Sequence, residues 1–292
     1  MKRFVAALGT LALVAVLVPA VGKQPGVAAA PILAGRVHKE FVPSQGKLFV
    51  LVIGNDARHG NPDRSRADAI HIVGLDTKTM RGGILNFPRD TWVAIPGHGS
   101  GKINEALYSG GPDLLARTLE NLTGIRLDYW VMTGFQGFVE IVRDLGRVTL
   151  RLRQPIFDSA SGARLRAGKN LLGGHGSLAF VRSRKTLPRG DIDRSTNQAR
   201  FLLALLRKLR ANVRRNPAHL LRWISVGRRN TRLNMSPEEQ FRLAVLATQV
   251  RPSRVRTVTI PVSIGSVGSA SVVFMAPGAR PIFARFRRTA RL

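Results

Sequence analysis

The chain has 292 residues, of which 46 are Lys or Arg and 17 are Asp or Glu, so its formal net charge is +29 at pH 7. A field of this sign predicts an anionic partner: nucleic acid, anionic lipid head groups or a phosphorylated glycan. The absence of cysteine excludes disulfides, thiol catalysis and thiolate metal sites. The six histidines form no HExxH motif and no close pair at metal-ligand spacing.

The N-terminus places Lys2 and Arg3 before the apolar or small residues 4–21. A positive segment followed by a hydrophobic one predicts a signal-anchor or a cleaved signal peptide over residues 1–22. We therefore expect the protein at the extracytoplasmic face of the cell membrane, or secreted if the segment is cleaved. Residues 23–46 are small, contain proline and are weakly patterned, which is typical of a linker.

Three strand-like runs follow at residues 47–54, 69–76 and 82–88. A charged loop joins the first two and a short turn joins the last two, so we predict a three-stranded antiparallel meander. In such a meander the end of the first strand, the start of the second and the end of the third share one edge. That edge carries Asp56, Asp68 and the run Pro88–Asp90.

Helical and strand patterns alternate along the rest of the chain. Helices are predicted at 111–124, 135–146, 172–181, 193–212, 217–226 and 236–250, and strands at 127–133, 147–155 and 256–262. This α/β succession predicts an α-β-α layered sandwich with a mixed central β-sheet. The catalytic domain would span residues 47–262, followed by a tail over 263–292 that is Gly/Ser-rich and then basic.

The residue types at the predicted edge indicate phosphate chemistry. Mg²⁺ is typically held by one or two carboxylates together with substrate phosphate oxygens, and Asp56 and Asp68 offer two. Guanidinium groups could clamp a diphosphate and stabilise the charge that grows on it. The candidates are Arg66, Arg89, Arg182, Arg184 and Arg194.

No arrangement for nucleophilic catalysis is evident. The run "GGHGSLAF" (173–180) lacks the G-x-S-x-G pattern and is predicted to be helical, which argues against a Ser177 nucleophile. Phosphoryl transfer by positioning and electrostatics needs no protein nucleophile. Between Arg147 and Arg232 there are 21 basic residues and three acidic ones, two of them in "RGDIDR", where they can orient arginines. Those acidic residues are Asp158, Asp191 and Asp193.

Seven stretches between Phe49 and Leu209, in order, resemble the LytR-CpsA-Psr family of envelope phosphotransferases. They read "LVIGNDAR", "RADAIHIV", "NFPRDTWVAIPGHGSGKINEALYSGGP", "LENLTGIRLDYWV", "GFVEIVRDLGRV", "SLAFVRSRKT" and "GDIDRSTNQ". The resemblance implies a Mg²⁺-dependent phosphotransferase, with Mn²⁺ as the alternative ion. Such an enzyme transfers an anionic glycopolymer from a polyprenyl-diphosphate carrier to peptidoglycan and forms a phosphodiester.

The resemblance also implies roles for individual residues. Asp56 and Asp68 match the metal-binding aspartates. Catalytic roles fall to Arg66, Arg89, Asp90, Asp191 and Arg194, with Asp90 as a partner for an arginine. Substrate binding falls to Lys102, Arg182, Arg184 and Gln198. The family places its lipid in an apolar tunnel between sheet and helices, which no periodicity here reveals.

Two positions depart from the family pattern. Asn197 stands where the family commonly has arginine before the motif glutamine, which removes a phosphate contact. The run "GGHGS" (173–177) also differs from the usual sequence and is expected to affect local helix packing more than chemistry.

Other functions remain as alternatives to the transferase. One is a non-catalytic protein that binds polyprenyl diphosphate or glycan, and another is a pyrophosphatase that uses water as acceptor. A DNA-binding transcriptional attenuator is disfavoured by the export segment, the few aromatic residues and the lack of a helix-turn-helix motif. We therefore expect membrane and peptidoglycan partners and no nucleic acid. The polymer could be arabinogalactan, a teichoic-like acid or a capsular glycan.

Overall fold

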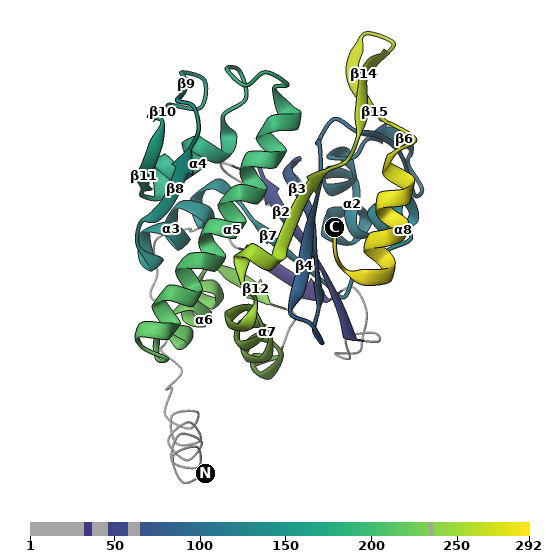
Figure 1. Cartoon of the computed structure of the whole chain (residues 1–292). Coiled ribbons are helices and arrows are strands. Elements are labelled where there is room, and N and C mark those ends of the chain that lie inside the picture. Colours follow the sequence, from purple (N-terminus) through teal and green to yellow (C-terminus); the bar gives the residue numbers. More distant parts are fainter. Residues whose placement is uncertain (1–31, 37–45, 58–64, 234–235) are drawn as a thin grey trace, which may run out of the picture.

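The computed structural model of the chain describes residues 32–36, 46–57, 65–233 and 236–292 (Figure 1). The predicted membrane segment at residues 1–22 lies outside this part. None of the described helices is both long and apolar enough to cross a membrane.

The core of the fold is a seven-stranded mixed β-sheet in the order β12-β1-β7-β2-β3-β4-β13. Its strands are β1 (Ile32–Arg36), β2 (Lys47–Asn55), β3 (Ala67–Asp76), β4 (Arg81–Phe87), β7 (Tyr129–Thr133), β12 (Thr231–Leu233) and β13 (Val255–Thr259). Strands β2, β3 and β4 form the predicted antiparallel meander. β7 runs parallel to β2 and β13 parallel to β4, which makes the sheet mixed.

Helices cover both faces of this sheet, as the layered-sandwich prediction requires (Figure 1). Because side chains of a strand alternate between faces, Leu51 and Ile53 of β2 point to the same side and pack in one cluster with α2 (Glu105–Thr123) and α8 (Ala279–Thr289). The opposite face is covered mainly by α5 (Asp191–Arg215).

The remaining helices agree closely with the predicted positions. They are α3 (Phe135–Leu145), α4 (Gly174–Arg182), α6 (His219–Arg229) and α7 (Pro237–Gln249). The predicted helix at 111–124 differs most, because α2 begins at Glu105. Gly110 and Gly111 kink it, and Gly111 adopts φ +68°, a conformation that favours glycine. The predicted helix is therefore the second segment of a kinked one.

Four two-stranded antiparallel sheets lie outside the central sheet in the described part of the chain, and three of them precede α4. These three are β5 (Trp92–Ile95) with β6 (Gly99–Lys102), β8 (Val148–Leu152) with β11 (Gly168–Leu172), and β9 (Ile156–Asp158) with β10 (Ala163–Leu165). The strand predicted at 147–155 is β8, but it pairs with β11 and not with the main sheet. The inner side of β8 packs under α4 and α5, where Phe180 and Phe201 are buried.

Two segments differ from the predicted domain organisation. Part of the predicted linker forms β1, which pairs with β7 and β12 in the sheet. The predicted tail forms the hairpin β14 (Val262–Val267) and β15 (Ala270–Met275), followed by α8. The basic composition of α8 concealed two anchors, Phe283 and Phe286, which are buried in the core.

The seat of Phe286 explains why α8 belongs to the domain. Its ring meets Phe49 edge-on with centroids 5.4 Å apart. Gly74 and Gly83 provide the space beneath it, since a Cβ atom would lie 2.6 Å from the ring at Gly74 and 2.9 Å from it at Gly83. The C-terminal segment therefore completes the core of the sheet face that α2 covers.

Candidate active site

A β-bulge shapes the predicted edge of the sheet. Strands β2 and β3 pair regularly as far as Gly54 opposite Ala69, after which Asn55 pairs with Ala67 and Asp68 is the extra residue. A bulge of this kind re-aims the side chain of the extra residue. Beyond it, the Asp56 N–H donates to the Arg66 carbonyl at 3.2 Å, and the Arg66 N–H donates to Asp56 Oδ1 at 3.1 Å. The two predicted metal ligands therefore flank one bulge.

Two arginines and two aspartates form an ion-pair cluster at this edge. Arg89 Nη1 contacts Asp68 Oδ1 at 2.5 Å, and Arg89 Nε lies 3.5 Å from Asp191 Oδ1. Arg194 Nη2 lies 2.7 Å from the same Asp191 oxygen and 3.9 Å from Asp68 Oδ1. The cluster therefore joins the start of β3, the loop after β4 and the first turn of α5.

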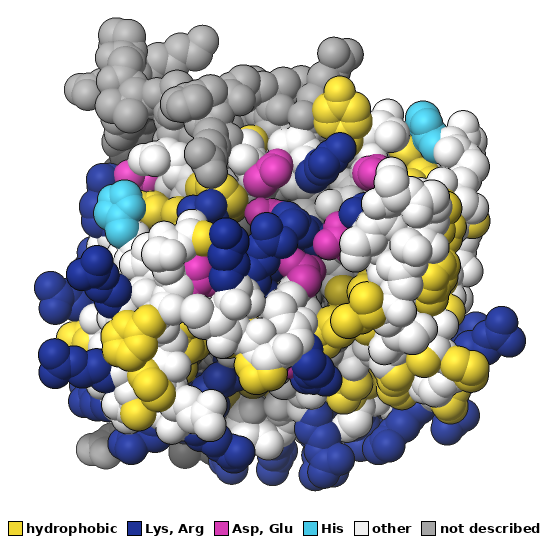
Figure 2. Space-filling view, turned by 90° about the horizontal axis from the view of Figure 1, so that it is seen from above, with side chains coloured by type: hydrophobic (Ala, Val, Ile, Leu, Met, Phe, Trp, Pro, Cys, Tyr) yellow, Lys and Arg dark blue, Asp and Glu magenta, His cyan; other side chains and the backbone are white. Residues whose placement is uncertain are grey.

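The hairpin β5–β6 extends the cluster. Lys102, at the end of β6, places Nζ 3.3 Å from Asp90 Oδ1, and Asp90 Oδ2 lies 3.7 Å from Arg89 Nε. Asp90 therefore bridges Lys102 and Arg89. Figure 2 shows basic and acidic side chains gathered at the middle of this face of the molecule.

Burial and charge shift the pKa values of the cluster in opposite directions. Burial raises the pKa of Asp191 above its ordinary value, although Arg194 and Arg89 oppose this. Burial likewise lowers the pKa of Arg194. For Arg89 burial acts in the same sense, but Asp68 and Asp191 outweigh it and the pKa is raised. Arg89 Nε and Arg194 Nε are buried and donate no hydrogen bond within the described part of the chain.

The other two predicted arginines follow α4. Arg182 stacks over Phe135, with Cζ 4.7 Å from the ring centroid, a cation–π contact. Arg184 is exposed, and its backbone N–H donates to Asp158 Oδ2 at 2.8 Å, as the Lys185 N–H does at 3.0 Å. Burial would raise the pKa of Asp158, but these and further backbone hydrogen bonds lower it overall. Asp158 thus holds the loop that carries Arg184.

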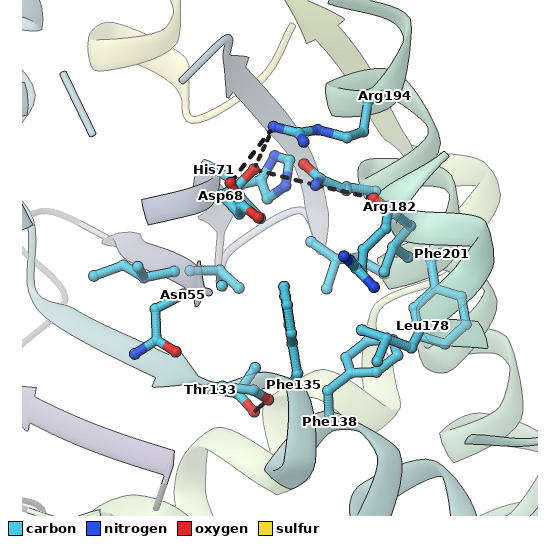
Figure 3. A pocket seen from close by; sticks show the side chains of 18 residues that line it. Asn55, Asp68, His71, Thr133, Phe135, Phe138, Leu178, Arg182, Arg194 and Phe201 are labelled. Carbon is cyan, nitrogen blue, oxygen red and sulfur yellow. Dashed lines mark hydrogen bonds and ion pairs between the residues drawn. The ribbon is translucent and has the colours of Figure 1, made fainter. Parts of the chain in front are cut away.

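An apolar pocket opens beside this cluster, between the sheet and helices α3, α4 and α5 (Figure 3). Phe135, Phe138, Leu178 and Phe201 form one end of it. Asp68, His71 and Arg194 lie toward the other end, and Arg182 lies between the two ends, over the ring of Phe135. An apolar cavity with charged groups at one end suits a ligand that has an apolar chain and an anionic head.

The carboxylates fit only a metal site that a substrate completes. No group of three or more His, Asp or Glu in the described part of the chain could hold a metal ion by itself. Asp56 and Asp68 supply the oxygen donors that Mg²⁺ prefers, and Mg²⁺ commonly takes its remaining ligands from phosphate and water.

The model of the LytR_cpsA_psr family matches residues 26–280 of the chain. The chain belongs to the LytR_cpsA_psr family. It is 35% identical over 179 residues to polyisoprenyl-teichoic acid–peptidoglycan teichoic acid transferase TagT of Bacillus subtilis, covering 58% of this chain and 55% of that protein. The chain spans about half the length of the curated relatives it matches.

Solved structures share the LytR_cpsA_psr fold. The structure of TagT bound to LI-WTA superposes with a TM-score of 0.72 and 25% identity, covering 91% of this chain and 99% of that one. A second, of the LytR-CPS2A-psr family protein YwtF (TagT) with bound octaprenyl pyrophosphate lipid, has a TM-score of 0.67 and 23% identity, covering 91% and 99%.

The LytR_cpsA_psr fold brings most of the predicted site residues together. One connected cluster contains Asp68, Arg89, Asp90, Lys102, Asp191, Arg194 and Gln198. Arg182 lines the adjoining pocket, and Arg184 is near enough to lower the pKa of Asp191. The side chain of Arg66 is exposed and makes no ion pair with a described residue. The roles of all these residues remain predictions.

Neither departure from the family pattern lines the pocket. Asn197 is buried outside the pocket lining, and its Oδ1 accepts a hydrogen bond from Arg200 Nη1 at 3.0 Å. In the run 173–177, Gly174 packs on the backbone of Val139, where a Cβ atom would lie 2.6 Å from the carbonyl oxygen. Ser177 is fully buried in α4.

Sequence reasoning missed two residues beneath the cluster, His71 and Asn86. Both stand in apolar strand runs, and both are buried on the α5 side of the sheet, where their side chains contact each other at 2.9 Å. The only signal was a polar residue in a run that otherwise reads as a central strand.

Proposed function

We propose that this chain transfers an anionic glycopolymer from a polyprenyl-diphosphate carrier to peptidoglycan and forms a phosphodiester bond. The observation that carries the proposal is the position of the arginine–aspartate cluster at the end of the apolar pocket. The name of the relative TagT, a polyisoprenyl-teichoic acid–peptidoglycan transferase, supports the same reaction class.

The pocket would hold the polyprenyl chain of the carrier, and the cluster would hold its diphosphate. The aromatic and aliphatic lining suits a polyprenyl chain, because burial of apolar surface stabilises binding by about 25 cal/mol per Å². Arg182 and Arg194 lie where that chain would meet its diphosphate. A planar guanidinium group can donate two parallel hydrogen bonds to two phosphate oxygens. It therefore fixes the orientation of the diphosphate as well as balancing its charge.

The proposed reaction is a substitution at the sugar-linked phosphorus. A hydroxyl of the peptidoglycan acceptor attacks, its oxygen forms the new bond to phosphorus, and the hydroxyl proton is released. The bond between phosphorus and the bridging oxygen breaks, and polyprenyl phosphate leaves with the electron pair. Arg89 and Arg194 stabilise the negative charge that grows on these oxygens. Asp191 contacts both arginines and orients them.

We propose Mg²⁺ as the cofactor, with Mn²⁺ as the alternative. Asp56 and Asp68 would hold it together with diphosphate oxygens. When bound, the ion neutralises part of the diphosphate charge.

We also propose that the chain works at the extracytoplasmic face of the cell membrane. The basis is the predicted segment 1–22, together with a carrier lipid and an acceptor that would both be found there. The membrane and peptidoglycan are the proposed partners, and nucleic acid is not one.

The test is release of polyprenyl phosphate from a polyprenyl-diphosphate glycan by the full-length chain in detergent, with peptidoglycan present and with Mg²⁺ or EDTA. We expect EDTA and the variant Asp68→Ala to abolish turnover, and Arg194→Ala to lower kcat by about 10²- to 10³-fold. Arg126→Ala is the matched control, because Arg126 is exposed and has no carboxylate partner in the described part of the chain.

The same assay separates the alternative functions. Release of polyprenyl phosphate that does not depend on peptidoglycan, with free glycan phosphate as the other product, would indicate a pyrophosphatase. Tight retention of the lipid by folded protein without any release would indicate a binding protein, and either result would overturn the transferase proposal.

A further inference from the structure

A groove runs along the outer side of α5, where the helix faces β8. Arg200, Leu203 and Arg207 line it from α5, at the positions i, i+3 and i+7 that share one face of a helix. Thr149, Leu150 and Arg151 line it from β8. The adjacent residues Phe201 and Leu202 line the apolar pocket, so α5 separates the groove from the pocket. We call Arg151, Arg200 and Arg207 the groove arginines.

The hairpin β8–β11 carries like charges face to face beside this groove. Arg151 of β8 stands directly opposite Lys169 of β11, and both side chains are exposed. Arg153, two residues after Arg151, is exposed as well. Like charges directly opposite each other destabilise a β-sheet. An anion over the hairpin would relieve this repulsion, so the pair indicates a surface that binds one.

The carboxylates of the surrounding sequence do not balance these charges. The stretch 147–232 contains three acidic residues, and all of them are engaged elsewhere. Asp158 holds the loop after α4, and Asp191 belongs to the ion-pair cluster. Asp193 pairs with Arg189 at 2.7 Å. The groove arginines form no ion pair with any residue in the described part of the chain.

Arg200 is fixed in the groove before any ligand binds. Its side chain is half-buried, its Nη1 donates to Asn197 Oδ1 at 3.0 Å, and its Nη2 donates to the Arg151 carbonyl at 3.1 Å. The second bond joins the two walls of the groove. Further N–H groups on Nε, Nη1 and Nη2 remain for an anion. A side chain that is already held in place loses less conformational entropy when a ligand binds.

We propose that this groove is a second anion-binding site, in which the groove arginines hold phosphodiester groups of the glycopolymer beyond the reacting phosphate. The inference rests on the proposed function for the identity of the polymer, but not for the presence of the site. Arg200 follows Arg194 of the cluster by six residues of α5, which is about 9 Å along the helix axis. A polymer that begins at the cluster can therefore reach the groove.

The arrangement of the groove arginines favours a chain over a single ion or a membrane surface. Arg200 and Arg207 are about 10 Å apart along the axis of α5, and Arg151 lies on the other wall. Positive groups spread in this way suit repeated phosphates. A flat membrane surface would meet the exposed Arg151 and Arg207, but not the half-buried Arg200 between the walls.

Binding is tested with a soluble, fluorescently labelled oligomer of glycerol phosphate, which has phosphodiesters but no prenyl chain and no diphosphate. The full-length chain in detergent is first saturated with polyprenyl diphosphate, so that the cluster is occupied. We expect Arg151→Gln/Arg207→Gln to raise the Kd of the oligomer by about tenfold or more, because hydrogen bonds to charged groups are lost. Both side chains are exposed, so the fold should be retained.

The matched control is Arg117→Gln/Arg126→Gln, which removes the same net charge. Arg117 lies in α2 and Arg126 before β7, and both are exposed and without an ion pair in the described residues. Their replacement should change the Kd little. Arg200→Lys keeps the charge but cannot keep both bonds that fix the guanidinium, so its Kd should also rise. Equal losses in the two double variants would show that only the overall field attracts the oligomer, and would overturn the proposal.

Turnover gives a second readout of the groove. Arg151→Gln/Arg207→Gln should raise KM for a carrier that bears the anionic polymer, with kcat little changed, because the groove does not touch the reacting phosphorus. For a carrier with a single uncharged sugar, which ends before the groove, KM should change much less. An equal rise of KM for both carriers would place the effect at the diphosphate and overturn the inference.

The outcomes separate the second site from the proposed function. If the unchanged protein releases no polyprenyl phosphate, the proposed function fails, while the oligomer still reports on the groove. If folded, unchanged protein does not bind the oligomer, the inference fails even where turnover is observed. Short-chain phosphatidylglycerol, soluble as a monomer, is the lipid probe. Binding of this lipid through the groove arginines, without binding of the oligomer, would assign the groove to lipid head groups and overturn the proposal.

Discussion

Buried polar residues hold the site from behind. Asp158 binds the backbone of Arg184 and Lys185, and His71 lies under Asp68. Neither would touch the diphosphate in the proposed complex. Because a buried group without a partner destabilises the fold by about 1–3 kcal/mol, Asp158 keeps the loop of Arg184 and Lys185 in one geometry. The arginines of the cluster are thus placed before any substrate arrives.

The depressed pKa of His71 predicts a specific loss of stability in acid. The unfolded chain binds a proton near pH 6.5, whereas the folded chain binds one near pH 4. The contribution is therefore complete above pH 6.5 and is lost as pH falls toward 4, by about 3 kcal/mol in all. Denaturant unfolding at a series of pH values measures it.

The variant His71→Gln is the control for this loss, since its free energy of unfolding should change less over the same pH window. The pKa values of Asp76 and Asp158 are lowered, so these two residues change the free energy of unfolding only below their ordinary pKa of 3.8. That range lies outside the window from pH 6.5 to pH 4. Parallel curves for the variant and the unchanged protein would contradict the prediction.

At the scale of elements, α8 is part of the domain core. It packs against the sheet beside α2 through Phe283 and Phe286, and its basic residues do not prevent this because they lie on the exposed side. The glycines of β3 and β4 make room for one large ring. The face of the sheet opposite the pocket therefore depends on the last residues of the chain.

The contact between Gly74 and Phe286 predicts coupled mutational effects. Phe286→Ala should destabilise the fold by about 3–5 kcal/mol through the cavity it leaves. Gly74→Ala should also destabilise it, because the new methyl group would lie 2.6 Å from the ring. In the double variant the second change should cost less than it does alone, since the ring is gone. Thermal and denaturant unfolding measure all three variants.

Phe157→Ala is the control for this cycle, because Phe157 is 57% exposed and its loss should change stability little. Strict additivity of the two core changes would show that α8 does not pack on β3 as described.

At the scale of the whole molecule, the positive charge is not neutralised within the fold. Arg151, Arg200 and Arg207 line a groove on the outer side of α5, and none of them pairs with a carboxylate in the described part of the chain. Burial and the repulsion of Arg153 lower the pKa of Arg200. The field of these arginines therefore reaches solvent and attracts anions.

This field predicts a salt-dependent rate. The Debye length falls from about 30 Å at 0.01 M salt to about 10 Å at 0.1 M. Over that range kcat/KM for a carrier bearing an anionic polymer should fall by about tenfold. The matched substrate is a polyprenyl diphosphate with a single uncharged sugar, for which the fall should be smaller. The same salt dependence for both substrates would contradict steering of the polymer.

The sequence by itself determined the meander, nearly all the helices and the charged residue types that gather at the edge. Those features depend on short-range patterns: the alternation of apolar residues, the stop signals at Gly124 and Gly146, and the motif runs that resemble one family. The strand order β2-β3-β4 followed from loop length alone, and it was enough to bring Asp68 and Arg89 to one edge.

Only the tertiary structure decided which buried polar residues support the site and which segments complete the core. Gln198 meets the carbonyl of Asp68 across 130 positions, and Phe49 meets Phe286 across 237. Such pairings depend on how elements distant in sequence pack in space, whereas local propensity reports only on neighbours along the chain. For the same reason the sequence of β1 is typical of a linker and that of α8 is typical of a tail. Only their contacts with the sheet make them part of the domain.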